Sequence, residues 1–205
     1  MKILTLMPFV DLWEMTVNAA LDVLDQSHPS LLLLISNGSV APLVSANPQA
    51  PRLAGVEIWR HDPPLPSLSA TWNAGLDSAW AAGFNAALVL NNDIRLHRRA
   101  LEFLVASMQA SKALFVSCVG VREESWIPDL DLSSVMQGSG KGGPDFSCFL
   151  ISKACHERYR FDEEFKPAFC EDLDYHRRMM LGGDGKKIFS ISVPFLHYSS
   201  QTLKS

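Results

Sequence analysis

Hydrophobic positions along the chain form short apolar runs that alternate with segments of helical periodicity. Residues 31–35 and 86–90 are apolar throughout and residues 113–119 nearly so, a pattern typical of strands buried on both faces of a parallel sheet. Shorter strands are expected at 2–7 and 56–59, and helices at 13–24, 69–82 and 98–108. This alternation predicts an α/β fold with a mainly parallel central sheet flanked by helices.

The pattern changes after residue 121. Residues 122–145 lack periodicity, and glycines crowd around Lys141, so we expect a loop there. Its part at 137–145 is either a lid, with Lys141 able to approach the diphosphate, or a plain surface loop. The later predicted elements are strands at 146–151 and 188–193, a short helix after Ser152, and a helix at 171–181 that Gly182 and Gly183 end. No repeat or linker interrupts the pattern, which predicts a single domain over residues 1–205.

Composition narrows the class of protein. The chain has 205 residues, 47% of them hydrophobic, and its longest apolar run falls far short of a transmembrane helix, so we expect a cytoplasmic protein with no membrane insertion. A net charge of −4 disfavours a protein that holds nucleic acid mainly through its phosphates. The four cysteines show no C-x-x-C spacing, which favours reduced core thiols over a zinc site.

Polar residues directly follow the predicted strand at 86–90. Open parallel sheets bind ligands outside the carboxyl ends of their strands, so Asn91, Asn92 and Asp93 are the first candidates for a site. A carboxylate beside amide oxygens suits a hard divalent cation that also binds phosphate oxygens. The alternative is that these residues only form a turn and cap the next element.

A second group of candidates opens the predicted helix at 171–181. Glu171, Asp172 and Asp174 all lie in its first turn, where acidic residues stabilise any helix, and Asp174 is spaced to pair with Arg178. The aromatic and proline-containing approach at 161–167 suggests that the helix start is aimed at a ligand. A third candidate, His197, follows the last predicted strand, and a lone histidine in such a place is more often structural.

In this order, the three groups resemble the family 2 glycosyltransferases of the GT-A fold. The resemblance covers most of the chain. Residues 5–24 look like the first strand and helix of that family, Asn37-Gly38-Ser39 like the end of its D-N-G-S signature, and residues 73–83 like its N-x-G-…-G stretch. It implies a nucleotide-binding half at about 1–95 and an acceptor and catalytic half at about 96–205.

The resemblance also implies roles for single residues. By position, Asp93 is a ligand of Mn²⁺ or Mg²⁺ on the diphosphate of a nucleotide sugar, and His197 is a further metal ligand. Asp172 is the catalytic base, and Glu171 contacts the acceptor or stabilises the helix start. The remaining residues implied to bind the nucleotide sugar are Asn37, Asn73, Asn91, Asn92 and Lys141. Two departures, Ser36 in place of the family's aspartate and Ser147-Cys148 where glycine is common, leave the nucleotide and the acceptor unidentified.

One base without a second nucleophilic carboxylate favours a single in-line displacement that inverts the anomeric centre. A nucleotidyltransferase is an alternative, although it usually carries a glycine-rich basic loop where this chain has Pro8-Phe9-Val10-Asp11. A non-catalytic sugar-nucleotide-binding module is another, although a binding module has no need of a base. The expected acceptor is a glycan or glycolipid, and less so a protein or a modified nucleic-acid base. Arg95, Arg98 and Arg99 form a small basic cluster, which we interpret as a solvated helix start in preference to a nucleic-acid-binding patch.

Overall fold

The computed structural model describes residues 1–39, 44–128, 130–132, 137–138 and 143–198. Its strands are β1 Ile3–Phe9, β2 Leu31–Asn37, β3 Glu57–His61, β4 Ala86–Leu90, β5 Ile94–Leu96, β6 Phe115–Val121, β7 Gln137–Gly138, β8 Cys148–Ser152 and β9 Ile188–His197. Its α-helices are α1 Trp13–Leu24, α2 Leu68–Ala81, α3 Ala100–Ser111, α4 Lys153–Arg158 and α5 Glu171–Leu181, with short 3-10 turns at Ala50–Leu53, Glu123–Ser125 and Gly185–Lys187. The α/β class predicted from the sequence is confirmed.

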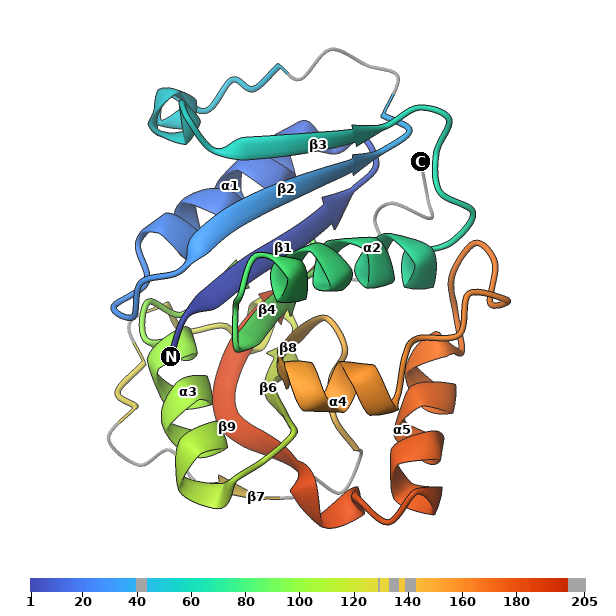
Figure 1. Cartoon of the computed structure of the whole chain (residues 1–205). Helices are drawn as coiled ribbons and strands as arrows, with labels where there is room; N and C mark the ends of the chain where they lie inside the picture. Colours follow the sequence, from blue (N-terminus) through green and yellow to red (C-terminus); the bar gives the residue numbers. More distant parts are fainter. Residues whose placement is uncertain (40–43, 129, 133–136, 139–142, 199–205) are drawn as a thin grey trace.

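The strands form one sheet in the order β3-β2-β1-β4-β8-β6-β9-β5, with β7 paired to β9 (Figure 1). From β3 to β4 every pairing is parallel, as the buried apolar runs predicted. Beyond β4 the sheet is mixed, because β8 runs antiparallel to both β4 and β6, while β6 and β9 are parallel. The expectation of a mainly parallel sheet therefore describes the first half of the sheet better than the second.

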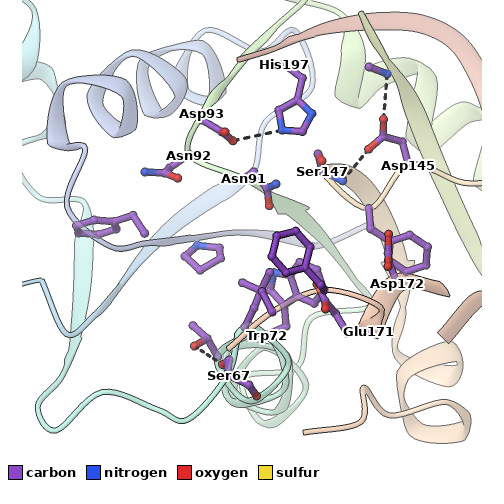
Figure 2. Close-up of a pocket in the computed structure, with 18 of the residues that line it drawn as sticks. Ser67, Trp72, Asn91, Asn92, Asp93, Asp145, Ser147, Glu171, Asp172 and His197 are labelled. Atoms are coloured by element: carbon purple, nitrogen blue, oxygen red, sulfur yellow. Dashed lines mark hydrogen bonds and ion pairs between the residues drawn. The ribbon is translucent and has the colours of Figure 1, made fainter. Parts of the chain in front are cut away.

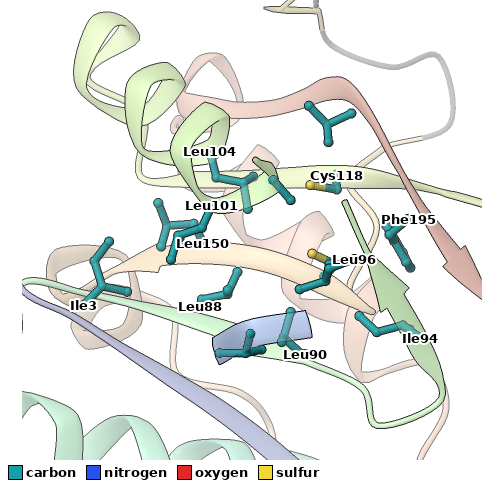
Figure 3. Packing of buried hydrophobic residues seen from close by; sticks show 14 of the residues in the cluster. Ile3, Leu88, Leu90, Ile94, Leu96, Leu101, Leu104, Cys118, Leu150 and Phe195 are labelled. Carbon is teal, nitrogen blue, oxygen red and sulfur yellow. The ribbon is translucent and has the colours of Figure 1, made fainter. Parts of the chain in front are cut away.

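Alternate side chains of the central strands enter two separate hydrophobic cores. In β2, Leu32 and Leu34 belong to one core and Leu33 and Ile35 to the other. A strand buried on both faces needs apolar residues at every position, which explains the unbroken run in the sequence. Helices α1 and α3 cover the first core, part of which Figure 3 shows, and α2, α4 and α5 cover the second.

Helix ends follow from local hydrogen bonding. The Ser67 hydroxyl accepts a hydrogen bond from the Ala70 amide at the start of α2, and Ser152 does the same for Cys155 at the start of α4, as predicted. Among the described residues, no helix is both long and apolar enough to cross a bilayer.

Apart from shifts of one to three residues at the ends of elements, the following details differ from the sequence-based expectation. The last strand continues to His197 instead of ending near residue 193, so this histidine lies in β9 and pairs in register with Ile94. The short strands β5 and β7 were not predicted: Asp93 and Arg95 break the apolar pattern around β5, and β7 lies within the expected loop at 122–145. Of the cysteines, Cys118, Cys148 and Cys155 are buried free thiols as expected, whereas Cys170 is exposed.

Candidate functional site

A cavity of about 880 Å³ opens outside the carboxyl ends of β1, β2 and β4. This is the edge at which open parallel sheets bind ligands. Figure 2 shows how the polar side chains of the cavity lie. Of the residues singled out from the sequence, the cavity is lined by Asn37, Asn91, Asn92, Asp93, Glu171, Asp172 and His197.

Asp93 and His197 meet on one side of this cavity. Because Ile94 pairs with His197 across β5 and β9, the preceding Asp93 is brought beside the imidazole, with 3.5 Å between His197 Nε2 and Asp93 Oδ1. The Tyr198 amide also donates a hydrogen bond to the Asp93 carbonyl. Burial alone would lower the pKa of His197, but the hydrogen bond and charge of Asp93, helped by the charge of Asp145, outweigh it and raise this pKa.

Asp93 and His197 are the residues of this cavity that would hold a divalent cation together with a nucleotide. Among the described residues there is no group of three or more histidine, cysteine, aspartate or glutamate side chains arranged to enclose a metal. Mg²⁺ and similar ions are commonly bound through one or two protein ligands together with substrate phosphates and water. Asp93 and His197 would be those ligands.

The two asparagines beside Asp93 have different surroundings. Asn92 is buried, and its side-chain amide donates a hydrogen bond to Thr16 in the first turn of α1, 3.0 Å away. Asn91 is half-buried at the cavity wall, and its backbone amide donates to the Ser147 carbonyl. Asn92 therefore fixes the turn after β4 against α1, and Asn91 is the better placed of the two to contact a ligand.

The start of α5 forms another wall of the cavity. Phe169 and Cys170, directly before the helix, both have positive φ angles, 84° and 67°, which cost energy in residues other than glycine and recur at functional sites. Glu171 is buried, and its Oε2 has no hydrogen-bond partner among the described residues. Desolvation by this burial raises the pKa of Glu171. An unpaired buried carboxyl oxygen at a cavity wall indicates a group whose partner is a ligand or water.

The next two acidic residues of α5, Asp172 and Asp174, differ in the groups that their carboxylates contact. Asp172 lines the cavity, and its Oδ1 accepts a hydrogen bond from the Leu173 amide. Asp174 is absent from the cavity lining and pairs instead with Arg178 across 2.7 Å, as its spacing predicted. The first turn of α5 therefore offers two carboxyl groups, Glu171 and Asp172, to the cavity.

Aromatic packing holds the start of α5 in place. The ring of Tyr175 stacks on Phe161 with centroids 4.2 Å apart, and Phe161 in turn contacts Trp72 of α2 at 4.9 Å. The Leu68 amide at the start of α2 donates to the Pro167 carbonyl in the segment before α5. These contacts join α2 to α5 and fix the position of the first turn of α5, which carries the carboxylates that line the cavity.

Two expected nucleotide-binding asparagines need a different interpretation. Asn37 reaches the cavity rim, but its side chain is hydrogen-bonded to both the amide and the carbonyl of Leu65. Asn73 is fully buried outside the cavity, where its amide group bonds to both backbone groups of Phe161, to Glu163 and to His156. Both residues position chain segments near the site. Lys141 and part of the expected lid at 137–145 lie outside the described residues.

Asp145, which no sequence motif singled out, also lines the cavity. Its Oδ1 accepts a hydrogen bond from the Ser147 amide at 2.9 Å and its Oδ2 one from the Gly120 amide at 3.2 Å. The residues predicted from the sequence follow the carboxyl ends of strands, whereas Asp145 precedes β8. Because β8 is antiparallel to β4, its amino end lies at the same edge as the carboxyl end of β4. No sequence pattern predicts the direction of β8, so no signal in the sequence could have found Asp145.

The small basic cluster after Asp93 is largely neutralised. Arg95 forms two hydrogen bonds with Asp22, and Arg99 forms two with Glu102. This supports the interpretation of the cluster as a solvated helix start rather than a nucleic-acid-binding patch.

No protein-family model and no curated protein matches the chain. Among solved structures, the chain is similar to S. aureus TarS. A structure of TarS residues 1–349 has a TM-score of 0.71 at 10% identity, and the same segment in complex with UDP has 0.69 at 12% identity. Both comparisons cover 96% of this chain and 60% of the TarS segment. A longer TarS structure has a TM-score of 0.68 at 12% identity over 98% of this chain and 37% of that one.

At this level of identity the similarity shows the fold. It confirms the GT-A type of α/β fold that the sequence motifs implied. The chain spans 60% of the length of TarS 1–349.

The network around Asn73 predicts a pH dependence of stability. Trp80 Nε1 donates to His156 Nδ1, so the imidazole proton is on Nε2, which donates to Asn73. Burial, the largest cause, lowers the pKa of His156 to about 4. Between pH 6.5 and 4 the unfolded chain therefore binds a proton that the folded chain excludes, and stability is lost as the pH falls. We expect the free energy of unfolding to drop by about 2 kcal/mol from pH 7 to pH 5 because of this residue.

Urea denaturation at a series of pH values measures this effect. The variant His156→Gln should be less stable at pH 7 but should lose much less stability between pH 7 and pH 5 than the wild type. If the free energy of unfolding fell equally with pH in the two proteins, His156 would not be held neutral in the fold.

Proposed function

We propose that this chain is a metal-dependent glycosyltransferase that moves a sugar from a nucleoside diphosphate to an acceptor hydroxyl with inversion of the anomeric centre. The observation that carries the proposal is the division of one cavity between two kinds of group. Asp93 and His197 lie at the carboxyl edge of the sheet, whereas Glu171 and Asp172 enter from the start of α5. One of the structures with a similar fold is TarS 1–349 in complex with UDP. This similarity supports a nucleotide-binding role for the cavity.

The proposed reaction has a simple balance. The acceptor oxygen forms a bond to the anomeric carbon, the bond from that carbon to the diphosphate breaks, and the acceptor proton goes to Asp172. A divalent cation held by Asp93 and His197 would supply positive charge to the departing diphosphate. Asn91 is placed to contact the sugar phosphate, and Asn92 maintains the turn that carries Asp93.

Asp172 is the better candidate for the base among the α5 carboxylates. Its hydrogen bond from the Leu173 amide uses one oxygen, and its half-buried side chain remains within reach of the cavity. Glu171, by contrast, is buried in the cavity wall with its Oε2 unpaired among the described residues, a position that suits a hydrogen bond to a ligand. We therefore assign Glu171 to hydrogen bonding with the acceptor. The acceptor class follows the sequence-based expectation of a glycan or glycolipid.

Asp93 should make nucleotide binding depend on a divalent cation. In calorimetric titrations with UDP, we expect binding at least about 10-fold tighter with Mn²⁺ than with a chelator, because the ion joins the carboxylate to the diphosphate. Asp93→Ala should lose most of this difference, whereas Asp162→Ala, which removes an exposed carboxylate outside the cavity, should keep it. Equal affinity of the wild type with and without metal would remove the metal from the proposal.

The role of Asp172 can be tested without knowing the acceptor. Uridine, guanosine and thymidine diphosphate sugars are incubated with the protein and Mn²⁺, and release of the nucleoside diphosphate to water is followed. Asp172→Asn should lower the rate by about 10²- to 10⁴-fold because the base is removed, with UDP affinity nearly unchanged. Asp174→Asn is the matched control, since its carboxylate pairs with Arg178 outside the cavity, and it should mainly lower stability.

Near-normal turnover by Asp172→Asn would refute the assignment of the base. If Glu171→Gln were the inactive variant, the base would be one residue upstream. Metal-dependent binding of nucleotide sugars without any turnover, with or without added glycans, would support a binding module in place of an enzyme.

A further inference from the structure

We propose that Asp145 binds hydroxyl groups of the sugar being transferred and so determines which nucleotide sugar the chain accepts. This inference rests on the proposed function and adds a specificity-determining residue to it. No motif of the sequence pointed to Asp145, and its role follows from its place in the structure.

The backbone fixes the Asp145 carboxylate in one orientation. The Ser147 amide holds one oxygen and the Gly120 amide holds the other, as the dashed lines in Figure 2 indicate. Its own backbone amide donates to the Ser117 hydroxyl, 3.0 Å away, which itself lies 3.1 Å from the Ser190 hydroxyl. A group held from three sides keeps its geometry without the ligand, which is a requirement for selective recognition.

The Asp145 carboxylate occupies the space that a side chain at position 120 would need. A Cβ atom on residue 120 would lie 2.7 Å from Asp145 Oδ2 and 3.2 Å from the ring of Phe195. Phe195 is fully buried, so the collision would be relieved chiefly by moving Asp145. Glycine at position 120 therefore allows the β6 backbone to approach closely enough to donate its hydrogen bond.

Asp145 lines the cavity that holds both halves of the proposed reaction centre, and Figure 2 shows it on the side where His197 and Asp172 also lie. Toward the metal side, it lines the same cavity as Asp93 and His197 (Figure 2). Toward α5, the adjacent Phe146 packs against Tyr175 with ring centroids 5.8 Å apart. In an in-line displacement the sugar ring lies between the diphosphate and the base, so a side chain on this wall faces the sugar.

A carboxylate in this position has the capacity to bind a sugar. Its two oxygens offer about four acceptor positions, and the two backbone amides use one on each oxygen. The remaining positions suit hydroxyl donors, and hydrogen bonds to charged groups are stronger than those between neutral groups. A site built to bond a hydroxyl rejects sugars that place the hydroxyl elsewhere, because its polar group is then left unpaired.

The test separates binding of the sugar from binding of the nucleotide. Affinities for UDP and for UDP-glucose, UDP-galactose and UDP-N-acetylglucosamine are measured with Mn²⁺ by calorimetry. For the preferred UDP-sugar, we expect Asp145→Ala to weaken binding by about 10- to 100-fold while UDP affinity changes less than about two-fold. Discrimination between the glucose and galactose epimers should shrink together with this loss. Gly120→Ala should produce the same pattern, because it displaces the carboxylate while leaving Asp145 in the sequence.

Asp162→Ala is a matched control. Asp162 Oδ1 accepts a hydrogen bond from the amide two residues later, Glu164, as Asp145 does from Ser147, but it is exposed and outside the cavity. This variant should bind UDP and the UDP-sugars like the wild type. Melting temperatures of all variants report whether the fold is kept.

The outcomes are distinct. An equal loss of UDP and UDP-sugar affinity in Asp145→Ala, or no loss of either, would overturn the assignment of Asp145 and leave the proposed function standing. A wild type that binds none of the UDP-sugars, nor any other sugar nucleotide of the uridine, guanosine and thymidine series, would overturn both.

Discussion

The antiparallel pairing of β8 with β4 is the constraint on which the candidate site depends. Leu90, the last residue of β4, pairs with Cys148, the first residue of β8, so opposite ends of the two strands share one edge of the sheet. Strand β6 then runs antiparallel to β8, and β9 runs parallel to β6, which brings Gly120 and His197 to the same edge. With parallel pairing throughout, the segment that carries Asp145 would lie at the far end of the sheet.

A second condition is the rigid attachment of α5 to the sheet. Burial of Tyr175 against Phe161 and Phe115 provides apolar contact that offsets the cost of burying the Glu171 carboxyl group nearby. The two positive φ angles at Phe169 and Cys170 add a further local cost. The packed core thus supports an energetically unfavourable arrangement at the cavity, as is common where a protein binds or transforms a ligand.

Apolar patterning predicted the elements well where burial is uniform. Strand β4 and helices α1 and α5 begin and end where the pattern placed them, because two-sided burial and amphipathic periodicity leave direct traces in the sequence. Strand direction leaves no such trace. The antiparallel placement of β8 could therefore not be predicted, and Asp145 was missed with it.

Residue type was also an incomplete guide to the site. Asp93, Glu171, Asp172 and His197 do line one cavity, but Asn73 does not, because all of its polar atoms are used inside the core. The sequence alone does not distinguish a buried asparagine that supports a loop from an exposed asparagine that binds a nucleotide. Only the three-dimensional partners of the amide separate the two roles.

In the proposed reaction, one cavity holds a metal-bound diphosphate beside Asp93 and His197 and directs the attached sugar toward Asp145 and Asp172. The most direct measurement is a crystal structure grown with UDP and Mn²⁺, with anomalous scattering used to locate the ion. We expect the Mn²⁺ signal beside the Asp93 carboxylate and His197 Nε2, with the β-phosphate of UDP coordinated to the ion. A Mn²⁺–UDP complex bound elsewhere on the chain, or one whose diphosphate contacts Glu171 and Asp172 instead, would contradict the account.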